Sequence, residues 1–563
     1  MRKSKQQGRG LQLASSQDHA RMFTDRGASI LLVGDHAVYT FAGVFPKIKV
    51  MARRAHEDTE PLLQSSHGDQ ATNKKKLSYE EAVEATGFGL FHWLLLVICG
   101  WANASDAVEI LCVSFLLPTA RCDLHLSSAD MGVLTASIFL GMMVGGYVWG
   151  YLADRRGRRS VLVVSLAVNG IFGAGASLAP SFWLFLLLRF FSGLGVGGSI
   201  PVIFSYFSEF QPCLRRGAMI SALATFWMAG NILAAGVAWL VIPRTSLNVR
   251  LSWLDFQSWR LFVVLCSIPS LSSALIFRLF MPESPKFLME AGRETEALSV
   301  FQTMFRLNNN FAIKTFPASG LVIRPKDDGE KDRLDSRSFT GRLKQALDPI
   351  KQLFVGPLAS RSVALLIIFY CISFGYYGLW MWFPELFNRV EDGGSACANT
   401  SRIQSSANES CYPVKTAVYM EGFITAASNL PGNIFTILLM DRLGGKILLS
   451  VSLMVSSVSV FVIYVVKTKS QSLIVSCVFS GVSVISWNAL DVLGTELYPT
   501  QLRSSALGFF TGVGRVAAVM GNVVFGQLVD SSCAVPLLMV SALLLAGGVA
   551  ALRLPQTKQT ELT

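Results

Sequence analysis

The sequence predicts an all-α integral membrane protein of twelve transmembrane helices, arranged as two parallel repeats of six. Of its 563 residues, 52% are hydrophobic and only 15% are charged, whereas about 25% of the residues in an ordinary soluble domain are charged. Apolar runs of about 20 residues, the length that crosses a bilayer, recur along the chain in two groups of six. A set of charged and small residues in the first group returns in the second. Together these observations exclude a soluble protein.

The first 90 residues precede the apolar runs and contain thirteen Lys or Arg among polar residues. This composition has no sustained periodicity and predicts a mostly disordered cytoplasmic tail at 1–90. The N-terminal half follows at 91–281. Its spans are expected at 91–118, 129–152, 160–179, 182–208, 218–242 and 259–281.

A polar, cytoplasmic central loop is predicted at 282–360, and the C-terminal half at 361–552. The second six spans are expected at 361–384, 416–440, 447–466, 473–497, 505–529 and 533–552. Between the first two of these lies a luminal loop at 388–415. The chain ends in a short cytoplasmic tail at 553–563.

Basic residues in alternate loops predict the orientation. The loops after spans 2, 4, 8 and 10 carry Arg155, Arg156, Arg158, Arg159, Arg215, Arg216, Arg442, Lys446 and Arg503. The loops after spans 3 and 11 carry none, and since basic loops stay in the cytoplasm, both termini are expected there. Arg389, Arg402 and Lys415 after span 7 are a weak contrary signal. The net charge of +12 therefore reflects topology and indicates no nucleic-acid partner.

An internal repeat relates the two halves. Seven residues recur at one offset of 287 positions: Leu152, Asp154, Arg155, Gly157, Glu209, Pro212 and Arg216 return as Leu439, Asp441, Arg442, Gly444, Glu496, Pro499 and Arg503. All of them lie at the predicted cytoplasmic ends of spans. Transporters built from such repeats hold their substrate near the membrane midplane, between the halves.

The turn between spans 2 and 3 reads Gly150-Tyr-Leu-Ala-Asp154-Arg-Arg-Gly157-Arg158-Arg. Gly157 permits a tight turn, and Asp154 can pair with arginines or cap the next helix. An ordinary basic turn is the alternative interpretation. The segment resembles the hallmark loop of the major facilitator superfamily, which implies the major facilitator fold. In that superfamily such residues form a charge network that closes the cytoplasmic side, and the resemblance assigns this gate to Asp154, Arg155, Arg158, Glu209, Arg216, Asp441, Arg442, Glu496 and Arg503.

Several motifs narrow the resemblance. They include Ser-Asp106-Ala-Val-Glu109, Gly198-Ser-Ile-Pro201 and Ser-Trp487-Asn488-Ala-Leu-Asp491. These segments, with others between about residues 79 and 556, are similar to the synaptic vesicle glycoprotein 2 family. That family carries a long luminal domain between spans 7 and 8, whereas about thirty residues separate the spans here. The chain thus resembles a relative with a short luminal loop, in the membrane of a synaptic or other secretory vesicle or in the plasma membrane.

Asp106 and Glu109 are the candidate coupling residues. Their i, i+3 spacing places them on one helix face, and Asp106 lies about 24 Å along span 1, well inside the hydrocarbon layer. Two ionised carboxylates would be costly there, so at least one is expected to be neutral and could carry a proton. A static pair bonded to hydroxyl groups of a neighbouring helix is the alternative.

Spans 5, 7 and 10 line the central cavity in the superfamily, and here they carry aromatic residues with one acid. Aromatic faces and an acid suit an apolar or cationic small molecule. The best candidates for substrate contact are Trp227, Tyr377, Trp487, Asn488 and Asp491. Packing against neighbouring helices is the alternative role for each aromatic.

Three short motifs concern the loops and the tail. Asn399-Thr-Ser and Asn408-Glu-Ser are glycosylation acceptors in the predicted luminal loop. Cys397 and Cys411 flank the same loop, where a disulfide is expected. Asp58-Thr-Glu-Pro-Leu62-Leu63 matches the acidic dileucine pattern that clathrin adaptors read.

Two functions remain open from the sequence. The first is a transporter of a small organic solute by alternating access, with proton coupling as one version. The second, implied by the resemblance, is a non-transporting vesicle membrane protein that regulates neurotransmitter release or vesicle trafficking. An enzyme is not expected, because no catalytic constellation stands at either membrane face. No cofactor or metal site is expected either, since no Cys-x-x-Cys pair occurs.

Overall fold

The computed structural model describes residues 22–25, 28–33, 36–39, 76–250, 255–309, 316–318, 320–322, 348, 350–356, 358–393, 414–498 and 500–555. The chain divides into two compact units, Met1–Thr72 and Asn73–Thr563. The first unit contains an antiparallel sheet of three strands, β1 (Met22–Asp25), β2 (Ala28–Val33) and β3 (His36–Tyr39). The sequence predicts a mostly disordered tail here, so the sheet is a difference from expectation.

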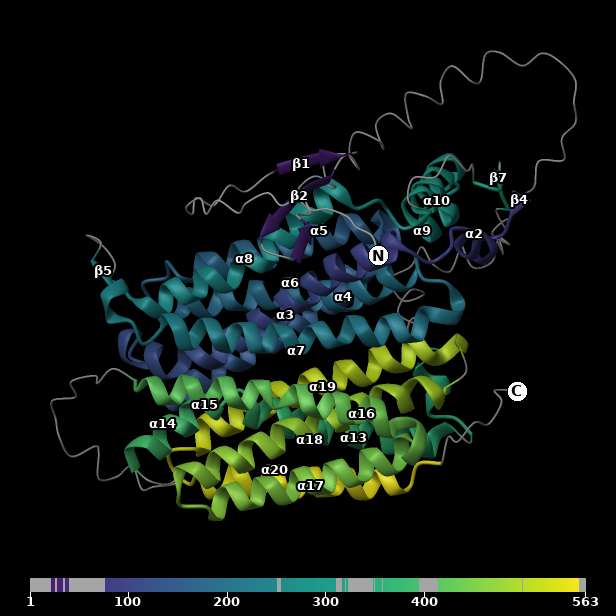
Figure 1. The fold of residues 1–563 in the computed structure, drawn as a ribbon. Helices are drawn as coiled ribbons and strands as arrows, with labels where there is room; N and C mark the ends of the chain where they lie inside the picture. Colours follow the sequence, from purple (N-terminus) through teal and green to yellow (C-terminus); the bar gives the residue numbers. More distant parts are fainter. Residues whose placement is uncertain are drawn as a thin grey trace, which may run out of the picture. The chain divides into compact units, whose positions relative to one another are not determined.

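The second unit contains the membrane helices (Figure 1). The N-terminal half consists of α3 (Leu90–Asp123), α4 (Ser128–Arg156), α5 (Arg158–Ala176), α6 (Phe182–Ser208), α7 (Arg216–Val241) and α8 (Ser258–Phe280). The C-terminal half consists of α13 (Leu358–Trp380), α15 (Thr416–Ala427), α16 (Asn429–Leu443), α17 (Gly445–Val465), α18 (Lys469–Glu496), α19 (Thr500–Leu528) and α20 (Ala534–Leu552). Within the described residues, twelve helical segments are long and apolar enough to cross a membrane, which confirms the predicted number.

One span is broken. Residues 416–440 form a single apolar segment, but α15 ends at Ala427 and α16 begins at Asn429. Pro431 in the first turn of α16 has no N–H group to donate to a carbonyl one turn earlier, which accounts for the interruption. The predicted loop at 388–415 also begins later than expected, because α14 (Phe383–Gly393) continues the chain beyond α13.

The repeated turn has the same backbone conformation in both halves. Gly157 ends α4 with φ 93° and Gly444 ends α16 with φ 81°, a region that favours glycine. We call the membrane side of these two glycines the motif side. The opposite side, where α14 ends and α15 begins, is the loop side.

Small elements cover the N-terminal half on the motif side. They are α2 (Tyr79–Ala85), α9 (Pro285–Glu290), α10 (Glu294–Asn308), the 3-10 turn η3 (Cys213–Arg215), and the parallel pair β4 (Lys76–Leu77) and β7 (Gly320–Leu321). On the loop side, η4 (Thr245–Leu247) and the antiparallel pair β5 (Val249–Arg250) and β6 (Asp255–Phe256) join α7 to α8. Helix α2 lies inside the tail predicted as disordered, and the capping box of Ser78 and Glu81 starts it.

The two halves meet along two helix pairs, α4 with α19 and α7 with α15. At the loop-side end of the first pair, Gly132 and Gly526 approach so closely that a Cβ atom on either would collide with the other backbone. At the second pair, the rings of Trp239 and Phe423 lie 5.7 Å apart. These contacts bring both repeats around one central space.

Candidate central cavity and its gates

A cavity of about 260 Å³ lies between the halves. Its walls come from α3, α6 and α7 of the N-terminal half and from α13, α18 and α19 of the C-terminal half. Its lining includes Asn103, Trp227, Tyr377, Trp487, Asp491 and Arg515. The size is near the lower end of small-molecule sites, which span about 300–1,000 Å³.

Aromatic rings form much of the wall. Tyr377 on α13 lies 5.8 Å from Trp487 on α18 and 4.9 Å from Phe139 on α4, measured between ring centroids. Tyr376 stacks on Trp380 at 5.3 Å. Trp227, Phe204 and Phe369 add further faces. Such walls suit a ligand with a flat apolar part.

All five residues predicted for substrate contact line this cavity: Trp227, Tyr377, Trp487, Asn488 and Asp491. Asn488 donates to Asn433 Oδ1 at 2.8 Å, and Asn433 donates to Thr225 at 3.3 Å. This chain of bonds joins α18, α16 and α7 across the two halves. Asn488 is therefore partly engaged in holding the wall together.

Arg515 is a lining residue that was not predicted from the sequence. Its guanidinium carbon lies 5.6 Å from the centroid of the Tyr377 ring, and its Nη1 is buried with no hydrogen-bond partner among the described residues. The position of Arg515 within a predicted span could have indicated this role, because burying an arginine in a membrane is energetically unfavourable unless it faces a cavity or a partner. The same reasoning applies to Arg189 on α6.

Asp106 and Glu109 do not line the cavity. Both are fully buried within the N-terminal half. Asp106 accepts hydrogen bonds from Ser199 at 2.6 Å and from Asn169 at 3.3 Å, so its hydrogen-bond partners are neutral.

Glu109 is ion-paired with Arg189 and accepts a bond from Ser192 at 2.8 Å. Arg189 is itself fully buried on α6. The two neighbouring carboxylates thus have different surroundings: Glu109 has a cation, whereas Asp106 has amide and hydroxyl groups. The hydroxyl groups that the alternative interpretation, a static pair, requires are present, and they belong to Ser192 and Ser199 on α6.

On the motif side, the predicted gate residues of the N-terminal half form a local network. Arg158 pairs with Glu209 at 3.3 Å and with the exposed Asp154 at 3.6 Å. Glu209 also accepts a hydrogen bond from Ser284, just before α9. Burial raises the pKa of Glu209, although the bonds from Ser284 and Arg158 oppose the rise.

The other predicted gate residues are less engaged. Arg216 pairs with Glu80 of α2 at 3.1 Å, and Arg155 stacks over Tyr151 at 4.4 Å. Arg442 and Glu496 are exposed, and no ion pair involves either of them within the described part of the chain. The side chains of Asp441 and Arg503 lie outside what the structure describes. Among the described side chains, no hydrogen bond or ion pair links the halves at the motif-side ends of the helices.

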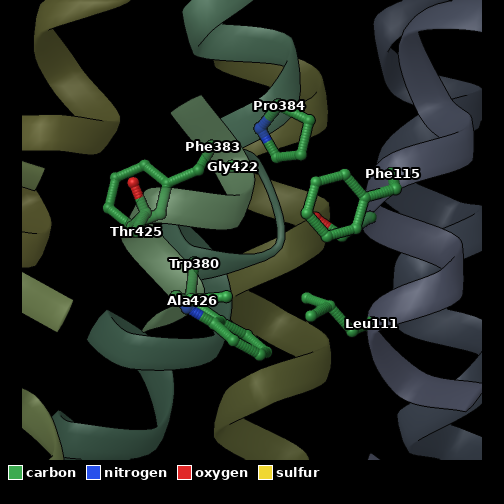
Figure 2. Close-up of a pocket in the computed structure, with 9 residues that line it drawn as sticks. Leu111, Phe115, Trp380, Phe383, Pro384, Gly422, Thr425 and Ala426 are labelled. Carbon is green, nitrogen blue, oxygen red and sulfur yellow. The ribbon is translucent and has the colours of Figure 1, made fainter. Parts of the chain in front are cut away.

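The loop side is closed by contacts between the halves. Ser114 on α3 donates to the Met381 carbonyl at 2.8 Å, and Thr119 on the same helix bonds to Tyr419 on α15. Phe115 packs directly over Gly422, where a Cβ atom would collide with the ring. Figure 2 shows Leu111 and Phe115 of α3 opposite Trp380, Phe383 and Thr425. The void that these residues line has a volume of only about 10 Å³.

A cluster of charges reinforces this closure, and we call it the loop-side lock. Glu385, nearly fully buried on α14, pairs with Arg121 of α3 at 3.3 Å and with Arg389 at 3.1 Å. Arg389 also bonds to Ser128 of α4 at 3.3 Å and pairs with Asp530 at 2.7 Å. Burial alone would raise the pKa of Asp530, but the bonds from Ser128 and Arg389 lower it overall. The lock therefore ties α14 to both α3 and α4.

Cysteines also mark the loop side. Cys122 at the end of α3 and Cys533 just before α20 are both disulfide-bonded, which was not predicted from the sequence. The predicted pair Cys397 and Cys411 lies outside the described residues, as do the acceptors Asn399 and Asn408. The adaptor motif with Asp58, Leu62 and Leu63 is likewise outside them.

The cavity is thus accessible from one side. The loop side is sealed by packing and charge, whereas the cavity-lining Asp491 and Thr511 remain exposed. A cavity between two repeats, closed on one side only, is the arrangement expected for alternating access.

Comparisons with known proteins agree with this architecture. A family model described as sugar (and other) transporter matches residues 64–344. Rat synaptic vesicle glycoprotein 2C is 31% identical over 85% of this chain and 80% of its own length. Human synaptic vesicle glycoprotein 2A is 32% identical over 85% of this chain and 79% of its own length. The human 2B protein is 30% identical over 85% of this chain and 86% of its own length.

Solved structures of the E. coli xylose transporter XylE have a similar fold. Its partially occluded inward-open conformation matches with a TM-score of 0.60 and 18% identity, covering 84% of this chain and 99% of that one. Its inward-open conformation matches with a TM-score of 0.59, covering 83% of this chain and 97% of the xylose transporter chain. The fold of this chain is that of the major facilitator superfamily.

Proposed function

Because the chain belongs to the synaptic vesicle glycoprotein 2 family within the major facilitator superfamily, we propose that it transports a small organic solute by alternating access. It is a multi-pass membrane protein and not an enzyme. The observation that carries the proposal is the central cavity, which is lined from both repeats, sealed at the loop side and accessible from the motif side. Its five predicted contact residues are Trp227, Tyr377, Trp487, Asn488 and Asp491.

The present conformation is the inward-facing one in this proposal. The basic turns at Arg158 and Arg442 favour a cytoplasmic motif side, and two of the similar xylose transporter structures are in inward-open or partially occluded inward-open conformations. The other state would break the loop-side lock and close the motif side. Closure would use the gate residues of both halves, with Asp441, Arg442, Glu496 and Arg503 joining those around Arg158. The loop side would then face the lumen of a vesicle or the outside of the cell.

Proton coupling is proposed at Asp106. Glu109 has its charge compensated by Arg189, whereas the hydrogen bonds of Asp106 within the described residues come from Ser199 and Asn169. Asp106 is therefore the carboxylate that could be neutral. It lies one turn beyond Asn103, which lines the cavity. Protonation there can consequently respond to changes in the cavity wall.

Uptake by the purified protein in lipid vesicles tests the proposal. A panel of small organic solutes is presented with and without a pH gradient across the vesicle membrane. We expect at least one solute to accumulate, and Asp106→Asn, which imitates the protonated form, to abolish accumulation driven by the gradient while exchange continues. The matched control is Asp130→Asn, a half-buried residue of the α4 capping box that lies outside the cavity. If no solute moves under any gradient, the alternative of a non-transporting regulator of vesicle trafficking is favoured.

Glycosylation tests the proposed orientation. Asn399 and Asn408 should carry glycans, because their loop would enter the lumen of the secretory pathway. Endoglycosidase should therefore increase the gel mobility of the expressed protein, and the double variant Asn399→Gln with Asn408→Gln should show no such change. A mobility change that persists in the double variant contradicts the placement of this loop.

A further inference from the structure

The central cavity contains two opposite charges that do not neutralise each other. Asp491 of α18 is exposed and Arg515 of α19 is partly buried, and both line the cavity. Neither takes part in an ion pair within the described residues. Charges placed inside a membrane protein are costly and normally have a partner. Two unpaired charges in one cavity therefore point to a ligand that supplies both partners.

The arginine favours a carboxylate. A guanidinium group presents donors in a planar fork that matches the two oxygens of a carboxylate. Nη1 of Arg515 has no hydrogen-bond partner among the described residues, and neither does Nε1 of Trp487. Both unused groups are donors, so acceptor atoms on the ligand would satisfy them. A purely cationic solute would instead be repelled by Arg515.

Aromatic rings separate the two charges. The Arg515 guanidinium lies 5.6 Å from the centroid of Tyr377, whose ring is 5.8 Å from Trp487. Asp491 follows Trp487 by four residues on α18 and so lies on the same helix face. The wall thus presents a cation, two aromatic rings tilted at 54° to each other, and an anion in series.

We propose that the solute is an aromatic zwitterion of the amino-acid class, with its carboxylate at Arg515, its ring against Tyr377 and Trp487, and its ammonium at Asp491. This inference rests on the proposed function, because it takes the cavity to be the solute site. Beside six aromatic rings, the uncharged polar side chains of the wall are Asn103, Ser373, Asn488 and Thr511, with the two tyrosine hydroxyls. Of these, Asn103 and Asn488 already donate to the Leu223 carbonyl and to Asn433. That composition fits one ring with a short charged chain better than a molecule rich in hydroxyl groups.

Three probes that share one ring separate the charges. L-tryptophan carries both charges, tryptamine only the ammonium, and indole-3-propionate only the carboxylate. Their binding to the full-length purified protein is measured by titration calorimetry in lipid nanodiscs, which does not require transport. A hydrogen bond to a charged group contributes enough for about a 10- to 100-fold difference in affinity. We therefore expect L-tryptophan to bind at least about tenfold more tightly than either of the other two probes.

Variants assign each charge to its partner. Asp491→Asn should remove the advantage of L-tryptophan over indole-3-propionate, and Arg515→Gln should remove its advantage over tryptamine. Trp487→Ala should lower the affinity for all three probes. The melting temperature of each variant without ligand shows that it is folded, and Asp130→Asn, which removes an acid outside the cavity, is the matched control.

The outcomes separate this inference from the proposed function. Equal binding of tryptamine and L-tryptophan by the unmodified protein overturns the role of Arg515, and failure of all three probes to bind overturns the zwitterion. If another class of solute is taken up while these probes do not bind, the transporter stands and the zwitterion falls. If L-tryptophan binds as expected while no solute is taken up, the site is supported and the transporter is contradicted.

Discussion

Arg189→Met is expected to destabilise the protein by about 3–5 kcal/mol, the range for removing one partner of a buried ion pair. Arg189 and Glu109 are both fully buried, so the substitution leaves the Glu109 carboxylate inside the N-terminal half with Ser192 as its remaining partner. Glu109→Gln combined with Arg189→Met removes both charges and should recover most of the loss, since replacing a whole buried pair is often nearly neutral. Thermal unfolding of the purified variants measures the effect.

The control for Arg189→Met is Arg293→Met. Arg293 pairs with Glu296 on the surface, and about half of each side chain is exposed. Such pairs contribute about 0–1 kcal/mol, so this variant should melt close to the unmodified protein. Equal stability of Arg189→Met and Arg293→Met would show that the buried pair does not hold α3 against α6.

Glu385→Gln is expected to open the loop side. The substitution weakens two ion pairs of the loop-side lock, those with Arg121 and Arg389, in the inward-facing state only. We expect the balance between the two states to shift by about 1–3 kcal/mol, or roughly 5- to 150-fold in their ratio. Glu391→Gln is the matched control, because Glu391 pairs with Lys415 and Lys469 within the C-terminal half. Fluorescence quenching of a label at the loop-side end of α3, by a quencher applied from that side, reports the opening.

Acid should not imitate Glu385→Gln through Asp530. The pKa of Asp530 is lowered in the folded protein, so its contribution to the lock is complete above the ordinary aspartate pKa of about 3.9. That contribution is lost only as the pH falls below this value. If the loop side opens between pH 7 and about pH 5, a group other than Asp530 controls it.

The sequence predicted the parts of this molecule that depend on local pattern. Apolar length predicted twelve spans, and the repeated Gly157 and Gly444 predicted turns that have the same backbone conformation. The positions of Trp227 and Trp487 came from the superfamily's helix order, and both line the cavity.

Features that depend on packing could not be read from the chain. The i, i+3 spacing placed Asp106 and Glu109 on one face of α3, but it could not say that this face meets α5 and α6 instead of the cavity. The lock joins Arg121, Glu385 and Asp530, which are more than 100 residues apart in sequence, and it exists only because α14 packs against α3 and its Arg389 bonds to Ser128 at the start of α4. Arg515 was not predicted, because the substrate contacts were inferred from acidic and aromatic residues in the spans. The unfavourable free energy of an arginine within a span would have indicated it equally well.

Opposite responses of the two gates test alternating access most directly. The probe is a single reactive cysteine, Thr511→Cys in the exposed cavity wall, in a Cys213→Ser background that removes the exposed native cysteine among the described residues. Membrane-impermeant maleimide is applied from either side to the otherwise unmodified protein, to Asp154→Asn and to Glu385→Gln. Asp154→Asn weakens the motif-side gate, so motif-side labelling should rise and loop-side labelling should fall. Glu385→Gln should do the reverse. Labelling that is unchanged in both variants, or that changes in the same direction in both, would contradict a cavity that opens to one side at a time.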